Sequence, residues 1–108
     1  MWHEAGLLSE LAVGGMKPVR VEGVHVVVCR CDDGMYAVSR RCGHENAPLD
    51  RGSLDGWIVT CPQHYAQFDV RSGHKLSLPT ELESRKTPTG DLDTYPVRVS
   101  GDTIEVEL

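Results

Sequence analysis

Two short Cys/His clusters constrain this chain more than any other feature. The first is Cys42-Gly43-His44 and the second is Cys61-Pro62-Gln63-His64, with sixteen residues between His44 and Cys61. Each cluster supplies one thiolate and one imidazole, whereas a zinc finger usually keeps its two Cys together and its two His together. A fold that uses all four side chains at one site must bring two loops side by side. The mixed order indicates that each loop serves two metals of different ligand preference.

The donor set favours iron with bridging sulfide. Soft thiolates suit an iron–sulfur unit, and imidazole raises the reduction potential of the iron it holds. A cluster with two Cys on one iron and two His on the other meets both demands. Structural zinc at the same four residues remains the alternative, because mixed Cys and His ligation also suits zinc.

The remainder of the chain reads as short strands separated by turns. Val24 to Cys31 is rich in β-branched residues, and Asp33-Gly34 predicts a hairpin turn after it. Asp55-Gly56 predicts a second turn, and Arg71 to His74 a third with Ser72-Gly73 at its centre. This spacing of strands and turns predicts an all-β sandwich or barrel.

The two ends of the chain and one internal segment complete this prediction. Thr103 to Leu108 alternates apolar and polar residues, which predicts a final strand. Only Leu7 to Ala12 invites a short helical turn. Thr80 to Asp93 is polar, contains Pro88 and Gly90, and predicts an exposed loop. With 108 residues, the chain is expected to form a single domain over residues 1–108.

The ligand spacing C-x-H-x16-C-x-x-H resembles the signature of Rieske 2Fe-2S proteins. The flanking residues extend the resemblance to soluble, low-potential Rieske-type ferredoxins over nearly the whole chain. The matching stretches are Met35-Tyr36-Ala37-Val38, Ala47-Pro48-Leu49, Gly52, Phe68-Asp69-Val70, Ser72-Gly73, Leu78-Pro79 and Tyr95-Pro96-Val97. The resemblance implies an antiparallel β sandwich or barrel with a small cluster-binding subdomain of two loops, roughly residues 40–80.

The resemblance also implies the cofactor and its ligands. Cys42 and Cys61 would hold one iron, and His44 and His64 the other, in one 2Fe-2S cluster per chain. The implied function is a soluble one-electron carrier that passes electrons from a flavin reductase to an oxygenase or another redox enzyme. As such a carrier, the chain itself would catalyse no substrate reaction, and a monomer is the default for a shuttle. A non-catalytic Rieske-like subunit of a larger redox complex is the alternative that the same motifs permit.

Departures from the high-potential branch of the family predict a low reduction potential. That branch carries a disulfide between the two loops, at the positions of Ala47 and Gln63 here. It also places hydroxyl donors to the cluster sulfurs at the positions of Ala66 and Phe68. Without these groups we expect a midpoint toward the low end of the Rieske range, about −150 to 0 mV.

Composition and the remaining cysteines narrow the other options. The net charge of −5 without a Lys/Arg stripe argues against nucleic-acid binding. No apolar run of about 18 residues and no signal-peptide pattern at the start occur, so no membrane span and a cytoplasmic location are expected. Cys29 and Cys31 lie two residues apart and are expected to share one strand face as small packing residues.

Overall fold

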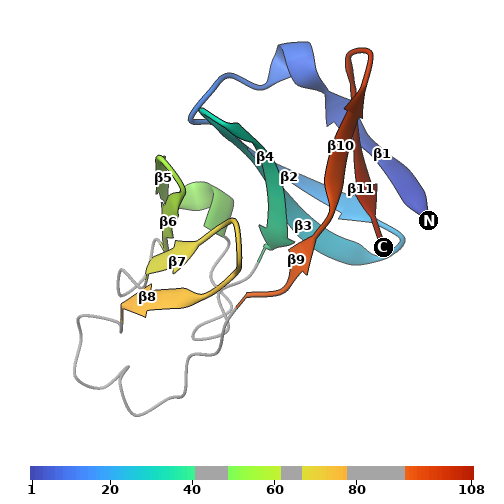
Figure 1. Ribbon diagram of the computed structural model, residues 1–108. Coiled ribbons are helices and arrows are strands. Elements are labelled where there is room, and N and C mark those ends of the chain that lie inside the picture. The colour runs from blue at the N-terminus through green and yellow to red at the C-terminus, as the bar shows by residue number, and fades with distance from the viewer. Residues whose placement is uncertain (41–48, 62–66, 78–91) are drawn as a thin grey trace.

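The computed structural model describes residues 1–40, 49–61, 67–77 and 92–108. Within these ranges the chain forms three antiparallel sheets and two short 3-10 helices (Figure 1). The predicted all-β class is therefore confirmed. None of the helices in these ranges is long and apolar enough to cross a membrane.

Two of the sheets pack face to face and form the larger part of the molecule. The first has the order β1-β11-β10, and the second has the order β2-β3-β4-β9. Their strands are β1 (Trp2–Leu7), β2 (Met16–Val21), β3 (Val24–Cys31), β4 (Gly34–Ser39), β9 (Thr94–Tyr95), β10 (Val97–Ser100) and β11 (Thr103–Glu107). The 3-10 helix η1 (Leu8–Glu10) connects β1 to the segment before β2.

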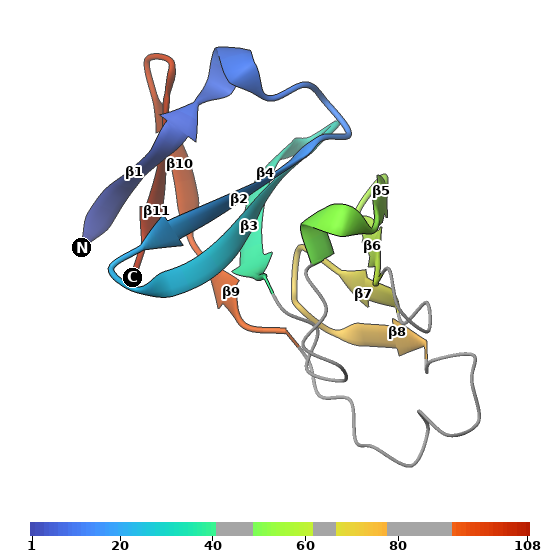
Figure 2. The same cartoon turned by 180° about the vertical axis from the view of Figure 1, so that it is seen from behind.

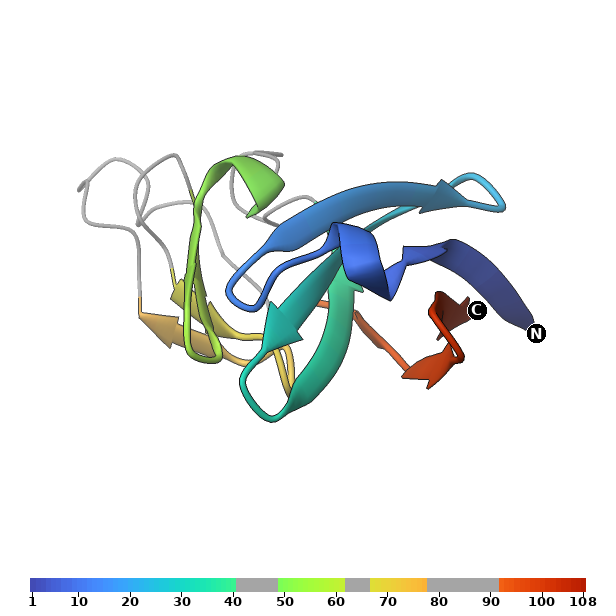
Figure 3. The same ribbon diagram turned by 90° about the horizontal axis from the view of Figure 1, so that it is seen from above.

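The third sheet forms the smaller part, on the other side of the second sheet (Figures 2 and 3). Its order is β5-β6-β7-β8, and the 3-10 helix η2 (Leu49–Arg51) precedes it. The strands are β5 (Ser53–Asp55), β6 (Ile58–Thr60), β7 (Gln67–Asp69) and β8 (Lys75–Ser77). This sheet lies within the range that the sequence predicts for the cluster-binding subdomain.

Strand β3 has apolar residues on both faces because it lies between two hydrophobic cores. Val26 and Val28 face the core between the first two sheets, together with Ile104 and Val106. The alternate residues face the core that the second sheet shares with the third. That second core comprises Val27, Cys29, Cys31, Val38, Leu49, Val59, Cys61, Phe68, Val70 and Leu92. A strand buried on both faces reads as a continuous apolar run, as the sequence of β3 does.

Several boundaries differ from the sequence predictions by one residue. The turn between β3 and β4 is Asp32-Asp33, and Gly34 already pairs with Cys31. The next hairpin turns at Gly56-Trp57, because Asp55 pairs with Ile58. The connection between β7 and β8 contains the predicted stretch Arg71 to His74, but its turn residues are Val70 to Ser72, and Gly73 after them adopts a φ of +79°.

Other elements were missed or only partly described. The sequence predicted neither η2 nor strands β1 and β2, whereas η1 lies within the predicted helical turn. Most of the predicted loop Thr80 to Asp93 falls outside the described residues. Leu92 belongs to the predicted exposed loop, but its side chain is only 6% exposed and packs in the second core.

Candidate functional site

The first predicted ligand segment, residues 41–48, is closed at its base by two contacts. The backbone N–H of Leu49 donates to the carbonyl oxygen of Arg40 at 2.7 Å. The Arg40 side chain also pairs with Asp50, with 2.8 Å between Nε and Oδ1. Both side chains of this ion pair are largely shielded from solvent. The two ends of the segment are thus held together where it leaves β4 and enters η2.

The second predicted ligand segment is closed by strand pairing. Thr60, the last residue of β6, pairs with Gln67, the first residue of β7. The Gln67 side chain adds a bond from Nε2 to Thr60 Oγ1 at 3.4 Å. Cys61 is the first residue after this strand, so its position is set by the end of β6.

The bases of the two segments meet at Gly52. A Cβ atom on this residue would collide with the carbonyl oxygen of Thr60. A residue without a side chain is therefore required for η2 to pass against the end of β6. This close approach explains why position 52 is a glycine, which the sequence alone singled out only through the family resemblance.

Cys61 is the one predicted ligand that the structure describes. Its side chain is fully buried, in the core that also contains Leu49 and Phe68. Cys42, His44 and His64 lie outside the described residues. Among the described residues no group of three or more His, Cys, Asp or Glu side chains has metal-binding spacing. The described frame nevertheless fits a two-loop cluster, since both segment bases are closed, adjacent and lined by the core that contains Cys61.

Cys29 and Cys31 have the packing role that the sequence predicts. Both are buried in the core shared with Cys61 and form no disulfide. Burial, reinforced by the neighbouring Cys31, raises the pKa of the Cys29 thiol to about 12. Burial and then the nearby Asp33 and Asp32 raise the pKa of Cys31 to about 11. Burial thus disfavours the thiolate form of both residues, which agrees with a packing role.

A polar bridge joins the second and third sheets. Asp33, in the turn after β3, accepts a hydrogen bond from Trp57 Nε1 at 3.0 Å and one from the Tyr36 hydroxyl at 3.2 Å. Arg71 stacks over the Trp57 ring at 4.0 Å. It also forms a two-point pair with Asp69, and these hydrogen bonds hold the pKa of that carboxyl below its usual range. Sequence reasoning missed this bridge because its members are distant along the chain.

These observations define the class of protein. Two segments that carry the predicted ligands, closed at adjacent bases on an antiparallel β framework, are suited to a small iron–sulfur protein, and the mixed Cys and His pattern of the sequence indicates the Rieske type. Residues 1–96 match the Rieske 2Fe-2S domain family. The chain belongs to this family, whose cofactor is a 2Fe-2S cluster.

Two individual relatives agree over nearly the whole length. The ferredoxin component of the naphthalene 1,2-dioxygenase system of Pseudomonas aeruginosa is 31% identical over 107 residues, which is 99% of this chain and 95% of the relative. The solved ferredoxin of carbazole 1,9a-dioxygenase from Nocardioides aromaticivorans IC177 is 32% identical, with a TM-score of 0.84. It covers 98% of this chain, and 96% of its own length is matched.

A third comparison places such a protein in an assembly. A chain in the solved complex of reduced oxygenase and oxidised ferredoxin in carbazole 1,9a-dioxygenase is 29% identical, with a TM-score of 0.82. The match covers 97% of this chain and 91% of that chain. The predicted function is confirmed by these comparisons: the chain is a Rieske-type ferredoxin, an electron carrier rather than an enzyme that transforms a substrate.

Proposed function

We propose that Cys42 and Cys61 hold one iron, and His44 and His64 the other, in one 2Fe-2S cluster per chain. The observation that carries this proposal is the closure of both segments at adjacent bases, beside the buried Cys61. When bound, such a cluster accepts and releases one electron. The described framework would hold the ends of both ligand segments and keep the Cys61 side chain buried.

Individual residues of the framework have distinct tasks in this proposal. The Arg40–Asp50 pair and the Leu49 backbone bond fix the first segment at both ends. The fully buried Phe68, opposite Val59 in the third sheet, fills the core that contains Cys61 and excludes water from it. A rigid, dry surrounding limits the rearrangement that accompanies a change of charge, which favours fast electron exchange.

We further propose that the acceptor is the oxygenase component of an aromatic-ring dioxygenase and that the donor is a flavin reductase. Relatives that match almost the full chain are ferredoxin components of naphthalene and carbazole dioxygenase systems, and one solved relative is in complex with its oxygenase. A monomer suits this role, since a shuttle must dissociate from each partner in turn. Single-domain organisation over residues 1–108 and a cytoplasmic location stay predictions.

A low reduction potential also stays a prediction, and the described residues support it at one position. Phe68 is fully buried and has no hydroxyl that could donate to a cluster sulfur. A midpoint between about −150 and 0 mV is expected in a redox titration. A value above roughly +200 mV would contradict this interpretation of Phe68 and its neighbours.

The ligand assignment is tested by a pair of matched cysteine variants. Cys61 and Cys29 are both fully buried in the same core, so Cys61→Ala and Cys29→Ala remove equal volume from it. We expect Cys61→Ala to lose the cluster, measured as iron and acid-labile sulfide per chain, whereas Cys29→Ala retains it. Equal retention in the two variants would remove Cys61 from the ligand set.

The carrier role is tested by electron transfer in a reconstituted system. The cluster-loaded protein, a flavin reductase with NADH and the oxygenase of an aromatic-ring dioxygenase are mixed without oxygen. Stopped-flow absorbance should show that the reductase reduces the ferredoxin and that the oxygenase reoxidises it. Reduction without reoxidation by any oxygenase of this class would leave the carrier role intact and refute the proposed acceptor.

A further inference from the structure

A small basic pocket lies on the second sheet, where β4 ends and the first ligand segment begins. It has a volume of about 240 Å³ and is lined by Pro18, Val19, Arg20, His25 and Arg40. Arg20 on β2 pairs directly with His25 on β3. The backbone N–H of Arg40 donates to the carbonyl oxygen of His25 at 3.1 Å. The three basic residues are therefore neighbours on β2, on β3 and just after the end of β4.

This row has little internal neutralisation. Within the described ranges, the exposed side chains of Arg20 and His25 make no hydrogen bond or ion pair. Among the described residues, the carboxylate partner of Arg40 is Asp50, and this ion pair uses the Nε atom of Arg40. Guanidinium groups stay charged, so Arg20 and Arg40 place two positive charges at one pocket with a single carboxylate partner among the described residues. An anion bound in the pocket would lie close to both charges.

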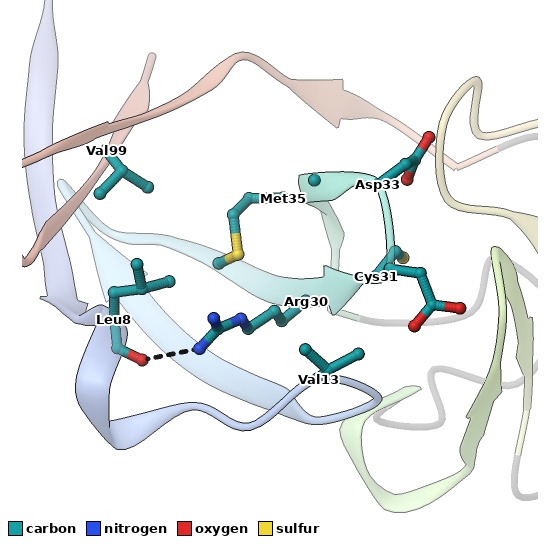
Figure 4. A pocket seen from close by; sticks show the side chains of 9 residues that line it. Leu8, Val13, Arg30, Cys31, Asp33, Met35 and Val99 are labelled. Atoms are coloured by element: carbon teal, nitrogen blue, oxygen red, sulfur yellow. Dashed lines mark hydrogen bonds between the residues drawn. The ribbon is translucent and has the colours of Figure 1, made fainter.

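Three described arginines, Arg30, Arg71 and Arg98, differ from Arg20 in having partners. Arg71 pairs with Asp69, and Arg98 pairs with Glu105. Arg30 lies in a cavity of about 320 Å³ near η1, where its Nη1 donates to the carbonyl oxygen of Leu8 (Figure 4). The same Nη1 donates to the carbonyl oxygen of Leu11. The guanidinium of Arg30 is therefore used to hold the segment that follows β1. In the pocket lined by Arg20, His25 and Arg40, by contrast, the N–H donors of Arg20 are available to a ligand.

We propose that the pocket lined by Arg20, His25 and Arg40 binds an anionic oxygen group, either a carboxylate or a phosphate. Guanidinium groups present planar pairs of N–H donors that match both groups. The net charge of the chain is −5, whereas this pocket is locally positive. The pocket therefore attracts anions and repels cations. The proposal is independent of electron transfer and of the identity of the redox partners.

The test is a titration of the oxidised, cluster-loaded protein with inorganic phosphate or acetate, at constant ionic strength. Backbone amide shifts at positions 20 and 25 are followed by 1H–15N NMR in the parent protein and in two variants. Arg20→Gln removes one cation from the pocket. Arg98→Gln removes the same charge from the first sheet and is the matched control.

We expect saturable shifts in the parent protein and in Arg98→Gln, with affinity at least about tenfold weaker in Arg20→Gln. Tighter binding of acetate would identify a carboxylate as the ligand group, and tighter binding of phosphate a phosphate ester. The absence of saturation with both anions would overturn the proposal. So would equal affinity in Arg20→Gln and the parent protein.

Discussion

Replacement of Phe68 by alanine tests how strongly the third sheet depends on the core that it shares with the second sheet. The side chain is fully buried, lies opposite Val59, and packs in the same core as Leu49 and Cys61. Replacement of a buried Phe by Ala costs about 3–5 kcal/mol, because transfer energy is lost and a cavity remains. A small domain has only about 5–15 kcal/mol of stability in total. Phe68→Ala should therefore remove a large part of it.

The assay is urea denaturation of the cluster-loaded protein, followed by far-UV circular dichroism and by visible absorbance of the cluster. With a urea dependence of about 1–3 kcal/mol per molar, the midpoint should fall by about 2 M. The matched control is Ile58→Ala on the neighbouring strand, where the side chain is 38% exposed, and its midpoint should fall by under about 1 M. Equal shifts in the two variants would refute the claim that this core supports the ligand segments.

Three further perturbations address other contacts of the same frame. Gly52→Ala should destabilise the protein by about 1–3 kcal/mol and reduce its iron content, because the new methyl group meets the Thr60 carbonyl; urea denaturation and iron analysis measure both effects. Trp57→Phe removes the indole donor to Asp33 but keeps a ring beneath Arg71, so denaturation should show a loss of about 1 kcal/mol. Between pH 9 and 11 the free energy of unfolding should fall less steeply in Cys29→Val than in the parent protein, by about 1.4 kcal/mol per pH unit. Denaturation at pH 9, 10 and 11 measures this difference.

The sign of the alkaline effect follows from where the Cys29 thiol ionises. In the unfolded chain it loses its proton above about pH 9, whereas in the folded protein it stays protonated to about 12. The unfolded state therefore binds fewer protons in this window, and stability falls as the pH rises. Below pH 9 the contribution is fully present, and Cys29→Val should show no pH-linked difference there. A parallel pH dependence in the variant and the parent protein would refute the assignment to Cys29.

The strands that the sequence predicts correctly are those with a distinct pattern. The run of β3 is apolar on both faces because two cores meet there, and β11 alternates because only Ile104 and Val106 point inward. Strands β1 and β2 lack such patterns. In β2, Pro18 and exposed Arg20 interrupt the apolar positions, and pairing with β3 determines the structure instead.

The turns and the frame of the site show what local sequence cannot specify. An Asp-Gly pair indicates a turn, but cross-strand register decides which two residues form it, and Gly34 proves to be the first residue of β4. The Asp33–Trp57 hydrogen bond and the Gly52–Thr60 approach depend on how the sheets pack, so no motif predicts them. The ligand spacing, by contrast, indicates the chemistry without any knowledge of packing, because ligand types and order restrict the metal.

The most direct test of the central claim is EPR spectroscopy of the dithionite-reduced protein, purified without chelator and labelled with 15N histidine. Two iron and two sulfide per chain, a g average below that of all-Cys 2Fe-2S proteins, and two 15N couplings in the electron–nuclear double resonance spectrum are predicted for ligation by His44 and His64. One zinc per chain without sulfide or an EPR signal, persisting after anaerobic reconstitution, would contradict the account.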